Sequence, residues 1–172
     1  MGGTAVTGPI PAPLTTSPRL QDLVTWDSDW AGLRVVVTGI GVSGFAAADT
    51  LIELGARVVV VDAATGTTAQ AQADTLRIVG AAEVLLGEDA VETVPKIDGA
   101  KPDLIVTSPG WRPDQALLAA AARAHIPVWG DVELAWRVRE RKGRKTADWL
   151  TITGTNGKTT TVGLTESMLD RK

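Results

Sequence analysis

The sequence contains no cysteine and only one histidine. Without cysteine, disulfide bonds, thiolate nucleophiles and cysteine-based metal sites are excluded. His125 alone cannot build a histidine-rich metal site, and its place after an alanine-rich helical stretch indicates a surface residue near a helix end. No apolar run approaches the length that spans a membrane. The N-terminus also lacks the basic start and apolar stretch of a secretory signal, so we expect a cytoplasmic protein.

Neither positive nor negative charge is in large excess, since the sequence has 17 Lys and Arg residues and 20 Asp and Glu residues. A net charge of −3 gives no reason to expect binding to nucleic acids or anionic membranes. The basic run over residues 137–145 is therefore interpreted as a solvated helix end and linker. Asp131 and Glu133 are interpreted as partners of a helix N-terminus rather than as paired catalytic carboxylates.

The chain of 172 residues has room for one full domain and part of another. Residues 1–30 are rich in Pro, Thr, Gly and Ser, which predicts a flexible lead-in from which Trp26 and Trp30 pack back onto the domain. From Leu33, short apolar runs alternate with helical patterns, which predicts an α/β fold: a Rossmann-like, parallel, five-stranded sheet flanked by helices. Strands are expected at 33–38, 57–62, 82–87, 103–110 and 126–130, and helices at 44–54, 68–80, 114–125 and 131–142.

A second domain is expected to begin near the end of the sequence. The first domain is predicted to cover residues 31–142, followed by a polar linker at 143–148. WLTITG at 149–154 is typical of a strand, and the stretch at 159–169 of a helix. We therefore expect residues 149–172 to be the truncated start of an ATP-binding domain, in a chain that is cut short.

GIGVSG at residues 39–44 fits the G-x-G-x-x-G pattern, after an expected strand and at the start of an expected helix. Gly39 permits a tight turn, Gly41 lets backbone approach a phosphate, and Gly44 allows close packing of helix and strand. The helix N-terminus offers free N–H groups to an anion. Asp62 ends the next strand, where its carboxylate can accept hydrogen bonds from ribose hydroxyls or a base. The pattern indicates a dinucleotide-like ligand; the alternative is a tight turn only.

A second glycine loop, GTNGKTT at residues 154–160, resembles a P-loop but has Ile152 where the usual pattern has glycine. Backbone N–H groups at a helix start can still hold phosphate oxygens, with Lys158 offsetting the β- and γ-phosphate charge and the Thr159 hydroxyl suited to Mg²⁺. The alternative is an Asn-Gly turn beside a surface lysine. The expected phosphate-binding residues are Gly154, Thr155, Asn156, Gly157, Lys158, Thr159 and Thr160.

These motifs together resemble one known family. TGTNGKT after an apolar strand resembles the ATP loop of the Mur ligases and the related folylpolyglutamate synthetases. Within that group, GIGVSG with Asp62, the TSPG turn at 107–110 and GDVEL at 130–134 resemble the D-glutamate-adding branch. The order and spacing of the motifs cover the chain from about residue 33 to residue 172.

The resemblance implies a first domain that binds UDP rather than NAD, in a monomeric enzyme of peptidoglycan biosynthesis, on which cell shape and division depend. It implies ATP-dependent, Mg²⁺-assisted addition of D-glutamate to UDP-N-acetylmuramoyl-L-alanine, with Lys158 as a catalytic residue. Ala63 and Ala64 depart from the polar residues that often follow the acid in the family. The implied UDP-substrate contacts are Gly39, Gly41, Val42, Ser43, Gly44, Asp62, Ser108, Pro109 and Gly110.

Three other functions stay open. One is that of the L-alanine-adding Mur ligases, which the chain resembles less closely. GIGVSG with Asp62, taken alone, also fits a nicotinamide-dependent module, but such a module has no use for GTNGKTT. Taken by itself, the chain also fits a non-catalytic UDP-sugar-binding module. By the resemblance, further metal ligands and the amino-acid-binding domain would follow Lys172, so we expect no catalysis from residues 1–172 alone. Trp111 either lines the ligand cleft or covers the core.

Overall fold

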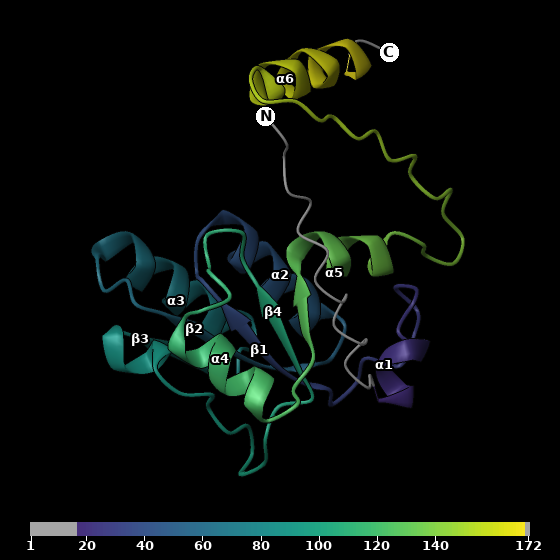
Figure 1. Ribbon diagram of the computed structural model, residues 1–172. Helices are drawn as coiled ribbons and strands as arrows, with labels where there is room; N and C mark the ends of the chain where they lie inside the picture. Colours follow the sequence, from purple (N-terminus) through teal and green to yellow (C-terminus); the bar gives the residue numbers. More distant parts are fainter. Residues whose placement is uncertain (1–16, 171–172) are drawn as a thin grey trace, which may run out of the picture.

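Five parallel strands form one sheet in the computed structural model, which describes residues 17–170. The predicted α/β class and five-stranded parallel sheet are confirmed. The spatial order is β3-β2-β1-β4-β5, so β1 lies at the centre (Figure 1). The strands are β1 (Arg34–Thr38), β2 (Arg57–Asp62), β3 (Glu83–Leu86), β4 (Leu104–Thr107) and β5 (Val128–Gly130).

The strands are valine-rich because both faces of the sheet are buried. Successive side chains of a strand point to opposite faces, so Val35 and Val37 enter one core while Val36 enters the other. A continuous apolar run, rather than an alternating one, is what two covered faces require.

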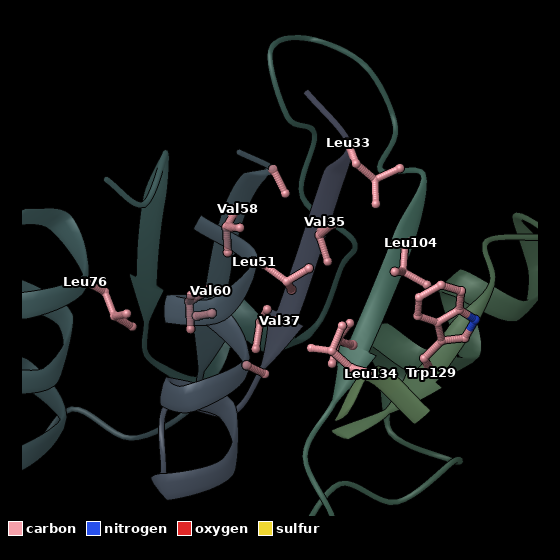
Figure 2. Close-up of a cluster of buried hydrophobic side chains, with 14 of the residues drawn as sticks. Leu33, Val35, Val37, Leu51, Val58, Val60, Leu76, Leu104, Trp129 and Leu134 are labelled. Atoms are coloured by element: carbon pink, nitrogen blue, oxygen red, sulfur yellow. The ribbon is translucent and has the colours of Figure 1, made fainter. Parts of the chain in front are cut away.

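Within residues 17–170, three of the helices that follow β1 cover one face of the sheet and one covers the other. Helices α2 (Val42–Glu53), α3 (Thr67–Val79) and α5 (Asp131–Val138) contribute Leu51, Leu76 and Leu134 to the larger core, which Figure 2 shows. Helix α4 (Ala116–Arg123) packs Leu117 and Leu118 on the opposite face. A short 3₁₀ helix, η1 (Glu88–Val91), follows β3.

The strand order reverses direction between β1 and β4. The chain leaves β1 toward β2 and β3, and then returns to the other side of β1 to form β4 and β5. The two central strands are tied at their carboxyl ends, where the buried Thr38 hydroxyl donates to the Thr107 hydroxyl at 2.9 Å. In open α/β sheets, ligands bind in the crevice outside the carboxyl ends of the strands at such a switch point.

The segment that precedes β1 packs on the domain, in contrast to the flexible lead-in expected from its composition. Residues 17–30 include helix α1 (Pro18–Asp22) and bury Leu20, Leu23 and Trp30. Arg137 of α5 holds the segment by donating to the carbonyls of Leu20 and Leu23. The expectation is therefore wrong for residues 17–30, because apolar anchors outweigh the polar composition. Trp30 packs back as predicted, and residues 1–16 lie outside the described residues.

The strand expected at residues 149–154 is absent, and this prediction is wrong. The stretch is extended but has no strand pairing, and it leads to α6 (Lys158–Leu169), which lies apart from the sheet (Figure 1). A strand requires a neighbour to receive its backbone hydrogen bonds, and the described residues place none beside it. Helix α6 agrees with the prediction for residues 159–169. The helix expected at 131–142 ends earlier, at Val138.

Candidate functional site

The first glycine loop lies at the switch point, directly after the central strand β1. Gly39 has a φ of 90°, which favours glycine, and its N–H donates to the Val61 carbonyl of the neighbouring strand at 2.8 Å. The chain therefore turns sharply out of β1 while staying bonded to β2. This is the tight turn that the sequence predicts for Gly39.

Gly44 permits the close approach of α2 to this turn. A Cβ atom added at Gly44 would lie 1.8 Å from the carbonyl oxygen of Gly39 and 2.8 Å from the Ser108 hydroxyl oxygen. A separation of 1.8 Å from a backbone oxygen is impossible without moving the helix. The predicted packing role of Gly44 is confirmed by this geometry.

Gly41 is the N-cap of α2 and faces open space. A Cβ atom added there would meet no atom within 4 Å, and no side-chain hydrogen bond caps the helix. The first-turn N–H groups of a helix have no partner within the helix. Together with the helix dipole, they make this surface suitable for an anion. Val42, which is 89% exposed, and the half-buried Ser43 form the first turn beside it.

Asp62 ends β2 and holds the glycine loop through its carboxylate. One carboxylate oxygen accepts a hydrogen bond of 2.6 Å from the backbone N–H of Ile40, and the other accepts one of 2.8 Å from Ala64. Both oxygens thus bind the protein's own backbone, although a carboxylate retains further lone pairs for a ligand. Sequence reasoning placed Asp62 at the site but missed its bond to the loop.

The Ser108–Gly110 turn follows β4 and packs against the first glycine loop. The backbone N–H of Ser108 donates to the Thr38 carbonyl at 3.2 Å. Its hydroxyl oxygen is buried without a hydrogen-bond partner, and it lies 2.8 Å from where a Cβ of Gly39 would be. Pro109 and Gly110 are exposed. The turn and the loop therefore form adjacent walls of the switch point.

Trp111 covers the core, which is one of the two roles left open by the sequence, and it lies beside the first glycine loop. It is partly buried against the core on the α4 face of the sheet, and its indole nitrogen lies 3.2 Å from the Cβ position of Gly39. The fold therefore brings together, around the carboxyl ends of β1, β2 and β4, all nine predicted UDP-substrate residues: Gly39, Gly41, Val42, Ser43, Gly44, Asp62, Ser108, Pro109 and Gly110.

The second glycine loop lies on a separate, exposed segment. Gly157, with a φ of 77°, is the N-cap of α6, and Gly154 also has a positive φ. Lys158 donates a hydrogen bond from its ammonium group to the Gly154 carbonyl, across the loop. Thr155, Asn156, Thr159 and Thr160 are exposed around the same turn. These residues stand at a helix start, as predicted, but distant from the first loop in the fold (Figure 1).

Residues 17–170 contain neither a cluster of metal-ligating side chains nor a membrane-spanning helix. Within this range, no cluster of three or more His, Cys, Asp or Glu side chains is placed to hold a metal ion. None of the helices in the same range combines the length and apolar character needed to cross a membrane.

Comparison with known proteins agrees with the fold and with the position of the motifs. A family model described as the Mur ligase MurD-like, N-terminal domain matches residues 33–130. The chain belongs to the MurD-like Mur ligase family. The match spans β1 to β5, and so includes the first glycine loop, Asp62 and the Ser108–Gly110 turn.

Curated relatives of this MurD-like chain are named UDP-N-acetylmuramoylalanine–D-glutamate ligase. One from Leifsonia xyli subsp. xyli is 49% identical over 156 residues, covering 88% of this chain and 29% of the relative. One from Streptomyces coelicolor is 50% identical over 142 residues, covering 83% and 29%. The chain thus spans less than a third of these relatives. Among solved structures, UDP-N-acetylmuramate-alanine ligase MurC from Thermotoga maritima aligns at 20% identity and a TM-score of 0.43, covering 58% of this chain and 21% of that chain.

Proposed function

We propose that the chain is the UDP-substrate-binding part of a ligase that uses ATP to add D-glutamate to UDP-N-acetylmuramoyl-L-alanine. The observation that carries the proposal is the meeting of the glycine loop and the Ser108–Gly110 turn at the switch point, in a MurD-like chain. The names of the relatives at about 50% identity support the choice of these two substrates. In this proposal residues 31–142 are the substrate domain, 143–148 the linker, and 149–172 the start of the ATP-binding domain.

The first loop suits a phosphate of a UDP ligand. Gly41 leaves open space over the N-terminus of α2, where backbone N–H groups and the helix dipole favour an anion. Val42 offers an exposed apolar surface beside it, on which a flat base or sugar can pack. Asp62 keeps the loop in shape and retains lone pairs that can accept hydrogen bonds from ligand hydroxyls.

The second loop suits the phosphates of ATP. Gly154 and Gly157 take positive φ values, which turn the backbone into a helix start with free N–H groups, and a compact ammonium lies across the turn. Lys158 and the Thr159 hydroxyl are the residues of this chain that would hold a phosphoryl group and Mg²⁺. When bound, Mg²⁺ offsets the negative charge of the transferring group.

The reaction proposed for the whole ligase forms an amide in two steps. The substrate carboxylate attacks the γ-phosphorus of ATP, which gives an acyl phosphate and ADP. The amine of D-glutamate then attacks the acyl carbon and phosphate leaves. Lys158 contributes positive charge where negative charge develops during phosphoryl transfer.

Titration calorimetry of residues 1–172 tests the first part of this proposal. UDP-N-acetylmuramoyl-L-alanine is expected to bind more tightly than NAD, with UDP alone retaining part of the affinity. Tighter binding of NAD would favour the nicotinamide-dependent module and overturn the proposal. A matched variant, Gly41→Ala, is expected to weaken the UDP ligands without changing the fold, because its methyl group would occupy only the open ligand side of the loop.

A further inference from the structure

Helices α2 and α5 enclose an apolar groove of about 410 Å³. It begins beside Val42 and Ser43, in the first turn of α2, so it starts next to the first glycine loop. Small side chains leave the space between the helices open. The walls are formed by Ala46, Ala47 and Thr50 of α2 and by Leu134, Ala135 and Val138 of α5.

Trp149, which comes after the linker, forms part of the wall of this groove. Its ring meets that of Trp136 edge to face, with centroids 5.2 Å apart and an interplanar angle of 88°. An edge-to-face arrangement is one of the geometries that aromatic pairs prefer. Trp149 is 39% exposed, whereas Leu150 beside it is 67% exposed and lies outside this groove. Trp149 thus contacts the first domain from a segment that is otherwise largely exposed.

Trp136 is held in place to receive this contact. The guanidinium carbon of Arg139 lies 3.4 Å from the centroid of the Trp136 ring, and Arg139 also pairs with Glu140 at 2.9 Å. A cation over the ring and a second ring at its edge leave the Trp136 side chain little freedom. The receiving surface is therefore organised within α5 and its C-terminal end.

The tether favours Trp149 over any other partner of the Trp136 ring. Residues 139–148 connect the end of α5 to Trp149, and the linker within them is exposed and without regular structure. A short flexible tether gives a ligand an effective concentration in the millimolar range. A second copy of the chain or a free small molecule would have to compete with that local concentration.

We propose that the Trp136 ring, beside the α2–α5 groove, is an intramolecular docking site for Trp149, which closes one side of the groove when docked. The docked ring fixes the point at which the polypeptide carrying the second glycine loop leaves the first domain. The second glycine loop begins only five residues later, at Gly154, so docking limits how far that loop moves from the first domain. Residues 143–148 then act as a loop fixed at both ends, rather than as a free hinge: the Lys142 N–H donates to the Asp27 carboxylate before it, and Trp149 contacts Trp136 after it.

Limited trypsin digestion of residues 1–172 tests this docking, with cleavage after Lys145 followed by mass spectrometry. A protease needs a mobile stretch on both sides of the bond, so docking at Trp149 should slow cleavage in the linker. Trp149→Ala and Trp136→Ala are each expected to accelerate it about threefold or more, from the loss of one aromatic pair. The double variant should be no faster than the faster single variant. Leu150→Ala, the matched control, should leave the rate unchanged.

Any of three results for the cleavage rate would overturn the proposal. The single variants could be cleaved no faster than wild type, or the acceleration in the double variant could equal the product of the two single-variant accelerations. Leu150→Ala could also accelerate cleavage as much as Trp149→Ala does. Protection that increases with protein concentration would instead place a second copy of the chain against Trp136, and would overturn the proposal as well. Thermal melting of each variant separates undocking from unfolding of the domain. As a second measurement, the 5-fluorotryptophan resonance assigned to Trp149 should move in Trp136→Ala.

Discussion

The carboxylate of Asp62 lies 2.6 Å from the backbone nitrogen of Ile40, within the first glycine loop. This bond joins the end of β2 to the turn that leaves β1, two strands that are neighbours in the sheet. An acid at this position is expected from the sequence to read the ribose of a bound nucleotide. The structure gives it another task, since the same carboxylate holds the loop on which a phosphate would lie.

Asp62→Ala is expected to reduce both stability and ligand affinity. Removal of the carboxylate leaves the N–H groups of Ile40 and Ala64 without their acceptor. A hydrogen bond to a charged group contributes about 1.5–3 kcal/mol. Because the Ala64 bond is exposed to solvent, the Ile40 bond should dominate, and a loss of about 1.5–3 kcal/mol in the free energy of unfolding is expected. Urea denaturation and calorimetry with UDP-N-acetylmuramoyl-L-alanine measure the two quantities. Unchanged stability with weaker binding would show that Asp62 acts on the ligand only.

Two alanine substitutions in the first glycine loop should differ in their effect on the stability of the domain. Gly44→Ala places a methyl group 1.8 Å from the Gly39 carbonyl oxygen, and the backbone shift should destabilise the domain by about 1–3 kcal/mol or more. Gly41→Ala meets no atom within 4 Å and has a backbone that alanine adopts, so its stability should change by only about 0.5 kcal/mol. Its affinity for a UDP ligand should nevertheless fall. Equal stability of the two variants would contradict the packing role of Gly44.

Ser108→Ala should not destabilise the domain. The Ser108 hydroxyl is buried without a hydrogen-bond partner, and an unsatisfied buried polar group is unfavourable by about 1–3 kcal/mol. Its removal should therefore leave the free energy of unfolding unchanged or raise it by about 1 kcal/mol. If a bound UDP ligand supplies the missing partner, the same variant should bind that ligand more weakly. A clear loss of stability in the ligand-free protein would contradict this account.

The sequence predicts the parallel sheet well because its signals are local. Runs such as VVV in β1 and β2 require two buried faces, and GIGVSG has its meaning only between a strand and a helix. The packing of residues 17–30 depends on Arg137, far away in the sequence, so composition alone misses it. The strand expected at 149–154 does not form for a related reason. Its apolar pattern suits a strand, but a strand also needs a neighbouring strand to pair with, and the pattern of the segment itself carries no information about that neighbour. For the same reason, the Asp62–Ile40 bond appears only once β1 and β2 are paired.

Acid should weaken the domain through the Arg34–Asp103 pair at the opposite end of β1. Burial raises the pKa of Asp103, but hydrogen bonds from the Arg34 side chain and backbone lower it more, so it lies below its usual value of 3.8. A carboxyl group with a depressed pKa contributes stability above its unfolded pKa and loses it as pH falls through the folded pKa. Wild type should therefore lose stability below about pH 4.

Asp103→Asn should show a flatter pH dependence in that range, because it has no carboxyl group to protonate. The matched control is Asp98→Asn. Asp98 pairs with Arg57 at 3.1 Å, but both side chains are about half exposed, at 59% and 49%. Solvent screens such a pair, so Asp98→Asn should change the slope less. Chemical denaturation at a series of pH values measures both variants, and equal slopes in wild type and Asp103→Asn would contradict the prediction.

Lys158→Ala and Lys158→Arg should both abolish most ligation in a form of the protein as long as its relatives. The Lys158 ammonium lies across the second glycine loop, where a compact cation can face phosphate oxygens. Alanine removes the charge, while arginine keeps it on a larger planar group that does not fit the same place. The loss in rate should be about 10²-fold or more, as for removal of a preorganised transition-state donor. Affinity for the UDP substrate should survive, because its proposed site is on the first loop. The rate of ATP-dependent ligation and the calorimetric affinity for the UDP substrate are measured on each variant. A near-normal ligation rate would show that GTNGKTT is not the ATP loop. Loss of both the ligation rate and the UDP-substrate affinity would indicate unfolding.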